Sequence, residues 1–316
     1  MKRFIIMTVL LSVVCSIFSI TPLQEKMQNF TNENGKAYLT PLIYSMNSSL
    51  NSGIFNTAKV LKPFRFELLF NTNITLIPNS DKTFMAKRPD IEDPIFHTPL
   101  YEPDEVETAT FFGDKGGTFN LKADYTHYSD IDDIKLPDGT NLPAMPFVSP
   151  QINAGLPFHT EVMLRYFPPV QINTDIGKAQ FLGFGIKHDI MHYFPIPLPV
   201  DASIYGMYQN FKTEKVVNIN TIAAGIIVGK KLLMFDFYGS LNYNKLDINV
   251  DYESNQVVYE APNYITVPVK IKFSESDAKI RPQIGFSYTL LLLKFSLDAS
   301  FCKYPAYNLG LTVKLP

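Results

Sequence analysis

The fold is decided by the stretch KLLMFDFYGSLNYNKLDINV, which runs from Lys231 to Val250. One parity is mostly apolar and the other mostly polar: Leu233, Phe235, Phe237, Gly239, Leu241 and Tyr243 alternate with Met234, Asp236, Tyr238, Ser240, Asn242 and Asn244. A period of two predicts a β-strand whose two faces lie in unlike environments. At about 3.3 Å per residue this strand exceeds roughly 40 Å, far above the usual length. Such length suits a tilted strand that crosses a bilayer and projects beyond it.

The same alternation recurs along most of the chain and predicts further strands. The clearest segments are residues 65–77, 160–167, 182–189, 280–289, 294–301 and 307–315, with weaker ones at 108–112, 118–125, 201–212 and 216–228. Two acidic, proline-punctuated stretches, 89–107 and 127–146, predict long exposed loops. We therefore predict an all-β fold, a closed antiparallel transmembrane β-barrel of about 12–14 strands over residues 63–316.

The two ends of the barrel can be predicted from its last strands. In bacterial barrels both chain ends lie in the periplasm, where turns are short, and the outer loops are longer. Counting back from the C-terminus places the turn at 303–305 outside and the turns near 291–292 and 229–231 inside. Residues 251–278 then form one outer excursion, in which 264–273 is an added ribbon and not a full barrel strand.

The N-terminal residues predict export. Lys2 and Arg3 precede an apolar run from Phe4 to Ile20, which indicates a signal peptide over residues 1–19. Residues 20–62 are polar, rich in Asn and Ser and without alternation, so we expect short helical turns that form a cap or an N-terminal plug. The predicted location is the cell outer membrane, with its lipid and, through the C-terminal strand, the barrel-assembly machinery as partners.

Composition and motifs exclude several other functions. The chain of 316 residues carries a formal net charge of −2, which gives no electrostatic support to nucleic-acid binding. No nucleotide-binding or nucleophile motif is present, so we expect neither an enzyme nor a cofactor. His188 and His192 on one strand would lie about 13 Å apart, too far for one metal ion. The acidic residues 130–138 lack calcium-loop spacing and predict a solvated loop. No metal site is therefore expected.

Charged residues occur at the inward parity of the predicted strands. By phase these lumen-lining candidates are Glu161, Arg165, Lys187, Asp236, Arg281, Lys294, Asp298 and Lys314. Both signs occur, so the side chains either line a wet lumen or fill and brace the barrel interior.

The layout resembles the FadL-type outer-membrane transporters and related Gram-negative barrel proteins. In that family a hatch ends in Asn-Pro-Ala just before the first strand, and here Asn56-Thr57-Ala58 precedes the strand near Arg65. The plug-motif candidates are thus Asn56 and Ala58, with Thr in place of Pro. Residues 181–190 also resemble a recurrent strand of such proteins. The resemblance implies binding or passage of small hydrophobic, fatty-acid-like molecules through a plugged lumen.

Two other functions stay open from the sequence. The first is a structural or adhesive barrel without transport, whose acidic outer loops contact a surface. The second is a secreted soluble β-rich protein, which the 18% charged residues allow.

Overall fold

The computed structural model describes residues 31–93, 96–125, 132–173, 177–195, 198–260 and 263–315. The predicted signal peptide, residues 1–19, and the first part of the predicted plug, residues 20–30, lie outside the described residues.

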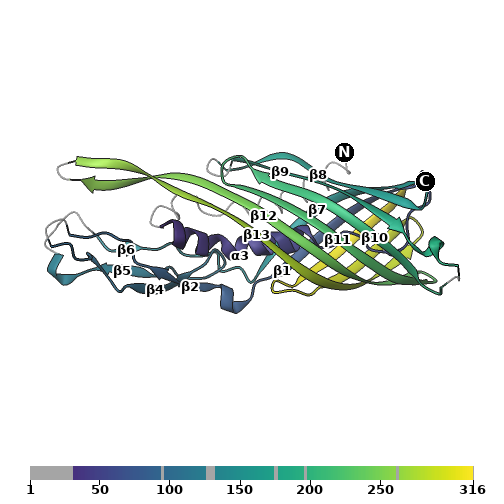
Figure 1. The fold of residues 1–316 in the computed structure, drawn as a ribbon, viewed down its shortest axis with the longest axis horizontal. Helices are drawn as coiled ribbons and strands as arrows, with labels where there is room; N and C mark the ends of the chain where they lie inside the picture. The colour runs from purple at the N-terminus through teal and green to yellow at the C-terminus, as the bar shows by residue number, and fades with distance from the viewer. Residues whose placement is uncertain are drawn as a thin grey trace.

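Ten strands form a closed antiparallel barrel in the described part of the chain (Figure 1). They are β1 (Phe66–Leu76), β7 (Ala144–Leu156), β8 (Thr160–Asn173), β9 (Gly177–Asp189), β10 (Asp201–Thr213), β11 (Val217–Leu232), β12 (Phe235–Glu260), β13 (Asn263–Leu290), β14 (Leu293–Ser300) and β15 (Ala306–Leu315). Each pairs with the next, and β1 closes the ring by pairing with both β7 and β15.

The predicted number of strands, 12–14, is wrong because residues 77–143 add nothing to the barrel. Their strands are β2 (Thr83–Lys87), β3 (Tyr101–Glu102), β4 (Glu105–Ala109), β5 (Thr118–Leu121) and β6 (Ile134–Lys135). These pair only with one another, β2 with β4 and β3 with β5 with β6. None reaches the roughly 9–11 residues that a strand needs to cross a bilayer. We call residues 77–143 the outer segment.

Alternation separates the two faces of the barrel wall. On β12, Phe235, Phe237 and Leu241 are exposed, whereas Asp236 and Asn242 are buried inside the ring. A closed ring satisfies every backbone hydrogen-bonding group, and its apolar outer face suits lipid. Within the described residues, no helix is both long and apolar enough to cross a membrane.

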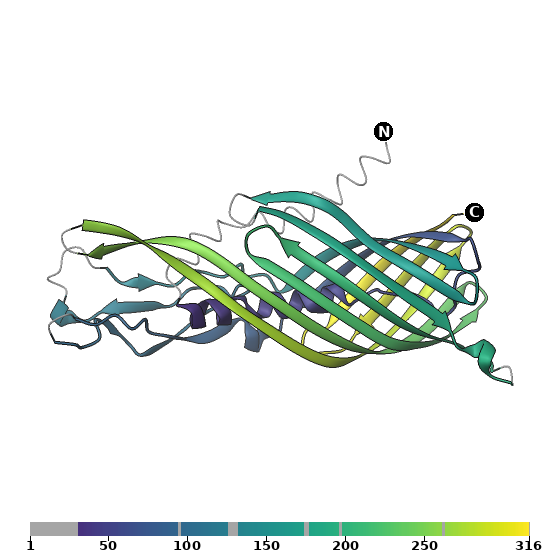
Figure 2. The same cartoon turned by 45° about the horizontal axis from the view of Figure 1, so that its top comes forward.

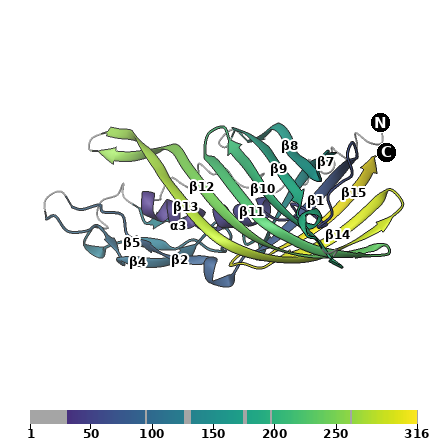
Figure 3. The ribbon, with the colours of Figure 1, turned by 45° about the vertical axis from the view of Figure 1, so that its right-hand side comes forward.

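The two ends of the barrel differ because one of them carries large extensions of the chain. The end opposite residues 77–143, called the inner end after the predicted orientation, has turns at residues 157–159, 233–234 and 291–292 and one longer connection at 190–200. The turn expected at 229–231 instead lies at 233–234, because Gly229 to Leu232 still pair with Tyr238 to Phe235. The other end carries the outer segment and the hairpin of β12 and β13, which extends well beyond the barrel (Figures 2 and 3). The expected ribbon at 264–273 is the outer part of β13, paired in register with β12.

A helix fills the outer half of the barrel. Helix α3 (Asn32–Leu50) is one continuous element of 19 residues and not the short turns that the sequence predicted. Thr31 caps it, because its Oγ1 accepts a hydrogen bond from the Asn34 amide at 3.3 Å. The helix begins beside the outer segment and ends within the barrel (Figure 1).

Candidate functional site

The barrel lumen is occupied by the chain that follows α3. We call residues 51–62 the luminal segment; it runs from the end of α3 to the start of β1 at the inner end of the barrel. Inward-facing side chains of the wall bind its backbone at several points between the middle of the barrel and its inner end.

Arg165 on β8 makes the densest contact, near the middle of the lumen. Its Nη1 donates to the Leu50 carbonyl at 2.8 Å, and its Nη2 donates to the Ser52 and Gly53 carbonyls at 3.1 and 2.6 Å. Gln151 accepts from its Nε at 2.8 Å. The guanidinium group is fully buried, so these charge-assisted bonds replace its hydration and hold three carbonyl groups within residues 50–53.

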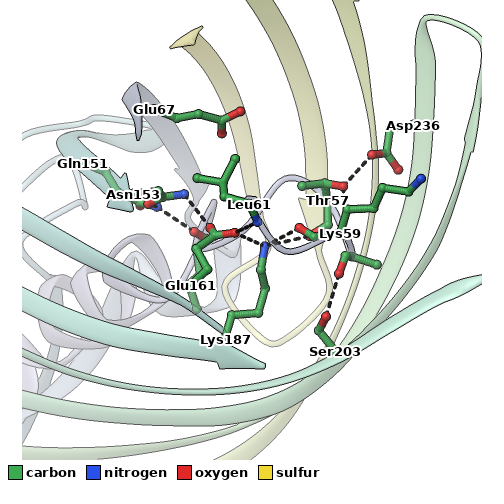
Figure 4. A network of polar contacts seen from close by, with 12 residues as sticks. Thr57, Lys59, Leu61, Glu67, Gln151, Asn153, Glu161, Lys187, Ser203 and Asp236 are labelled. Atoms are coloured by element: carbon green, nitrogen blue, oxygen red, sulfur yellow. Dashed lines mark hydrogen bonds and ion pairs between the residues drawn. The ribbon is translucent and has the colours of Figure 1, made fainter. Parts of the chain in front are cut away.

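A buried ion pair holds the segment nearer the inner end (Figure 4). Lys187 Nζ lies 3.1 Å from Glu161 Oε2 and donates to the Lys59 carbonyl at 2.9 Å. Glu161 Oε2 accepts from the Leu61 amide at 2.9 Å, and Asn153 donates to its other oxygen at 3.0 Å. Because each charge has several partners besides the other, the pair ties two strands to the luminal segment.

Further inward-facing charged side chains extend this network around the ring. Asp236 accepts from Thr57 Oγ1 at 2.5 Å, and Arg281 Nη1 donates to the Ser48 carbonyl at 2.8 Å. Asp298 instead braces the wall itself, since it accepts from Asn308, Gln283 and Tyr238 at 2.8, 2.9 and 3.2 Å.

The remaining lysines lie at the inner mouth. Lys294 Nζ is 3.7 Å from Glu67, and Lys314 is half-buried. Both line a cavity of about 420 Å³ between the luminal segment and the wall, with Asp236, Lys59 and apolar Leu61. The structure thus brings all eight predicted lumen residues to the inside of the ring. Seven of them are buried, and two of those seven, Asp236 and Lys294, also line this cavity.

The plug-motif residues also lie in the luminal segment. Asn56 is buried and donates to Thr312 Oγ1 at 3.1 Å. The Ala58 carbonyl accepts from Ser203 Oγ at 2.7 Å. Asn56 and Ala58 therefore contact β15 and β10, on different sides of the ring.

An apolar cluster inside the outer half of the barrel was missed from the sequence. Aromatic side chains of the wall pack against α3, and the buried members include Phe147, Phe167, Phe181, Phe211, Ile219, Leu246, Tyr38, Leu39, Ile43, Met46 and Leu50. Phe181 and Phe211 occupy the inward parity of their strands, which could have signalled this cluster. The lumen is therefore packed like a core at this level and not wet.

The outer segment packs directly on α3. Asn34 and Lys87 exchange two hydrogen bonds, at 2.8 and 3.0 Å. The Phe111 amide donates to the Tyr38 carbonyl at 3.0 Å. Phe112 and Phe119 join the apolar cluster described above. The helix thus connects the barrel interior to the outer segment in one continuous packed unit.

Asp81 fastens the start of the outer segment to the β14–β15 loop. Lys303 Nζ lies 2.6 Å from its carboxylate, and the Tyr304 hydroxyl donates to it. Burial of the carboxyl raises its pKa, but the hydrogen bonds from Lys303, Tyr304 and Ser80 outweigh this and lower it. Burial also raises the pKa of the Tyr304 phenol, and the Asp81 charge adds to this.

The expected distance between His188 and His192 is wrong. β9 ends at Asp189, and a 3-10 turn over Met191–Tyr193 brings His192 back, so the two ring centroids are 5.6 Å apart. In the acidic loop, Asp133 accepts from the Leu121 amide at 2.9 Å and Asp138 accepts from the Gly116 amide at 2.8 Å. Residues 126–131 of that loop lie outside the described part.

Comparison with solved structures finds other outer-membrane proteins at low similarity. Ail, the attachment invasion locus protein of Yersinia pestis, is 8% identical with a TM-score of 0.23, over 80% of this chain and 99% of that chain. Outer membrane protein AlkL is 8% identical with a TM-score of 0.27, over 84% and 96%. The transport unit of the autotransporter AIDA-I from Escherichia coli is 10% identical with a TM-score of 0.31, over 91% and 99%.

At these scores the likenesses add nothing to what the barrel itself shows. Its closed ring, apolar outer face and polar inner face are those of an outer-membrane β-barrel, and the outer membrane is where the protein resides. The resemblance to FadL-type transporters stays a prediction.

Sequence comparison gives the family but no relative of known activity. No curated protein sequence matches this chain. The profile of a family of unknown function (DUF6588) matches residues 1–315. The chain therefore belongs to the family of unknown function DUF6588.

Proposed function

We propose that the protein is a surface-exposed binding protein, whose barrel anchors the outer segment and the β12–β13 hairpin while the luminal segment closes the lumen as a plug. The observation that carries the proposal is the Arg165 contact with three carbonyl groups of the chain inside the lumen. A plug held by buried, charge-assisted bonds favours a static barrel over an open channel.

The charge of the outer segment points to the kind of partner. Residues 77–143 hold fourteen Asp and Glu against six Lys and Arg, a formal net charge of −8, whereas the whole chain carries −2. Asp90, Glu102, Glu105 and Asp114 are exposed. A concentrated negative field attracts cationic macromolecules and speeds their association. The partner is therefore proposed to be a basic protein or a basic surface polymer.

Binding to polymers of opposite charge tests this function. Protein in nanodiscs is expected to bind poly-L-lysine and not poly-L-glutamate, and binding should weaken as salt rises. Combining Asp90→Asn, Glu102→Gln, Glu105→Gln and Asp114→Asn should weaken poly-L-lysine binding by at least about tenfold.

A matched variant removes positive charge from the same segment. Lys115→Gln with Lys135→Gln should strengthen the binding of poly-L-lysine, because it makes the segment more acidic. Equal binding of the two polymers, or affinity for poly-L-lysine that neither variant changes, would refute the proposal.

The inner cavity favours a second function, the binding of small hydrophobic acids of the fatty-acid type. Its wall combines apolar Leu61 and Leu292 with cationic Lys294 and Lys314. Such a lining suits an acyl chain with a carboxylate head. A fluorescent fatty acid should then bind the purified wild-type protein saturably and should bind Lys294→Met more weakly, because the variant loses a cation that faces the carboxylate head. Unsaturable partition into detergent alone would exclude this function.

A further inference from the structure

Three potential metal ligands meet at the inner rim of the barrel, outside the lumen. They are His159 in the β7–β8 turn, Asp189 at the end of β9, and His192 in the 3-10 turn that follows. One ligand atom from each lies within 4.8 Å of the others. His159 lies thirty residues before Asp189 in the sequence, so the fold and not sequence proximity brings the three residues together.

The strand register brings the first two residues together. Thr160 of β8 pairs with His188 of β9, so the residues next to them, His159 and Asp189, face each other across the two strands. The Asp189 amide donates to the His159 carbonyl at 3.0 Å, which fixes this position. The pair is thus placed by the barrel wall and not by a long mobile loop.

The third residue arrives because the chain reverses after β9. The Ile190 amide donates to the Ala202 carbonyl at 3.1 Å, and the 3-10 turn at residues 191–193 follows. This turn stacks the ring of His192 on that of His159, with centroids 4.2 Å apart and planes 19° from parallel. Because each nitrogen lone pair lies in its ring plane, the two stacked imidazoles must rotate before both can bind one ion, and their closeness keeps this rotation small.

The surrounding hydrogen bonds leave the three ligands available. One oxygen of Asp189 accepts from the Met191 amide at 2.8 Å, which orients the carboxylate and leaves its second oxygen for an ion. His188, by contrast, uses both ring nitrogens, with Thr160 Oγ1 at 2.9 Å and the Tyr193 hydroxyl at 3.0 Å. His188 therefore stays outside the proposed set.

We propose that His159, Asp189 and His192 bind a zinc-class divalent transition-metal ion at the periplasmic rim. Zinc bonds to His nitrogen and carboxylate oxygen are about 2.0–2.2 Å, so two ligand atoms on one tetrahedral ion lie about 3.4 Å apart. Separations of up to 4.8 Å must therefore shorten by at most roughly 1.4 Å. Rotation of the exposed histidine side chains supplies this movement.

Ligand type and position define what the site can do. Imidazole with carboxylate selects zinc, copper or nickel over magnesium and calcium, which prefer oxygen ligands alone. Three protein ligands leave a fourth position on the ion, open to water or a periplasmic ligand. The bound ion would join the β7–β8 turn to the β9–β10 connection and so stiffen this rim.

Calorimetry with zinc chloride tests the site on detergent-purified protein without a histidine tag. The wild type is expected to bind one zinc ion saturably, whereas His159→Asn and His192→Gln should each weaken binding by more than about tenfold. Excess magnesium should not compete. Cobalt absorption gives a second readout, because cobalt bound by two imidazoles has ligand-field bands that differ in position and intensity from those of the hydrated ion.

His97→Asn is the matched control. His97 is exposed like His159 and shares its positive φ, 52° against 55°, and Asn tolerates that backbone at both positions. The control should bind zinc as the wild type does, and heat-modifiable electrophoresis should find every variant folded. Absence of saturable zinc binding, or equal affinity in wild type, His159→Asn and His192→Gln, would overturn the proposal.

Discussion

Replacing Arg165 with methionine should release the luminal segment without unfolding the barrel. Methionine keeps an unbranched apolar stem but is shorter and removes every donor. The carbonyls of Leu50, Ser52 and Gly53 then lose their bonds to the guanidinium group. The backbone pairing of β8 with β7 and β9 does not involve this side chain.

The size of the effect follows from the number of bonds lost. Hydrogen bonds to a charged group contribute about 1.5–3 kcal/mol each, and three are lost. Removing the buried charge also ends its own desolvation cost, which offsets part of this loss, so we expect a net change of about 3–5 kcal/mol, less than the sum of the three bonds. Since each 1.4 kcal/mol is tenfold, release of the segment becomes roughly a hundredfold to a few thousandfold more populated.

Hydrogen exchange measured by mass spectrometry reads this population directly. Amides of residues 50–56 should exchange faster in Arg165→Met by that factor, while strand amides keep wild-type rates. Arg281→Met is the comparison, because Arg281 binds a single carbonyl of the same chain, that of Ser48, and should have the smaller effect. Unchanged exchange at residues 50–56, or an equal effect of Arg281→Met, would refute the role given to Arg165.

Three further predictions concern topology, charge and pH. Lys36→Cys, in a Cys302→Ser background, should react on intact cells with a maleimide attached to 5-kDa polyethylene glycol. Lys62→Cys in the same background should react only after the outer membrane is opened. Reaction of both variants on intact cells would contradict this topology. Lys187→Met should lower the free energy of unfolding by about 3–5 kcal/mol, seen as a lower temperature of heat modification, because Glu161 is left buried and unpaired; an unchanged temperature would contradict this. Asp81 has a lowered folded-state pKa, so its stabilisation is present above about pH 4 and lost as the pH falls through the folded value; thermal melts of Asp81→Asn should show a deficit that shrinks toward acid pH, and a pH-independent deficit would count against it.

The barrel wall could be predicted from the sequence because lipid and protein interior select residues of opposite parity. Phe235, Phe237 and Leu241 lie outside the ring as their alternation indicates. The turn at residues 291–292 also lies where the flanking alternating segments predict it. The count of strands could not be predicted, since short strands of the outer segment have strand-forming residues but lack the length to span a bilayer.

Helix α3 was hidden because its surroundings are partly polar. Asn34, Ser45, Ser48 and Ser49 are buried against the wall or the outer segment, so the helix shows no clear apolar stripe. The apolar cluster in the outer half was missed for a related reason. The alternation predicts on which face of the wall a phenylalanine lies, but not that a helix packs against it. The predicted separation of His188 and His192 was wrong for a different reason. It assumed that one strand contains both residues, and nothing in the sequence marks the end of β9 at Asp189.

The central claim is that the chain's own N-terminal segment closes the lumen, so that the protein acts through its outer face by binding. Conductance tests this claim most directly. The measurement is single-channel recording of the purified wild-type protein in a planar lipid bilayer. We predict no steady ion-conducting state at moderate voltage. A stable open channel of porin type in most insertions would contradict the account.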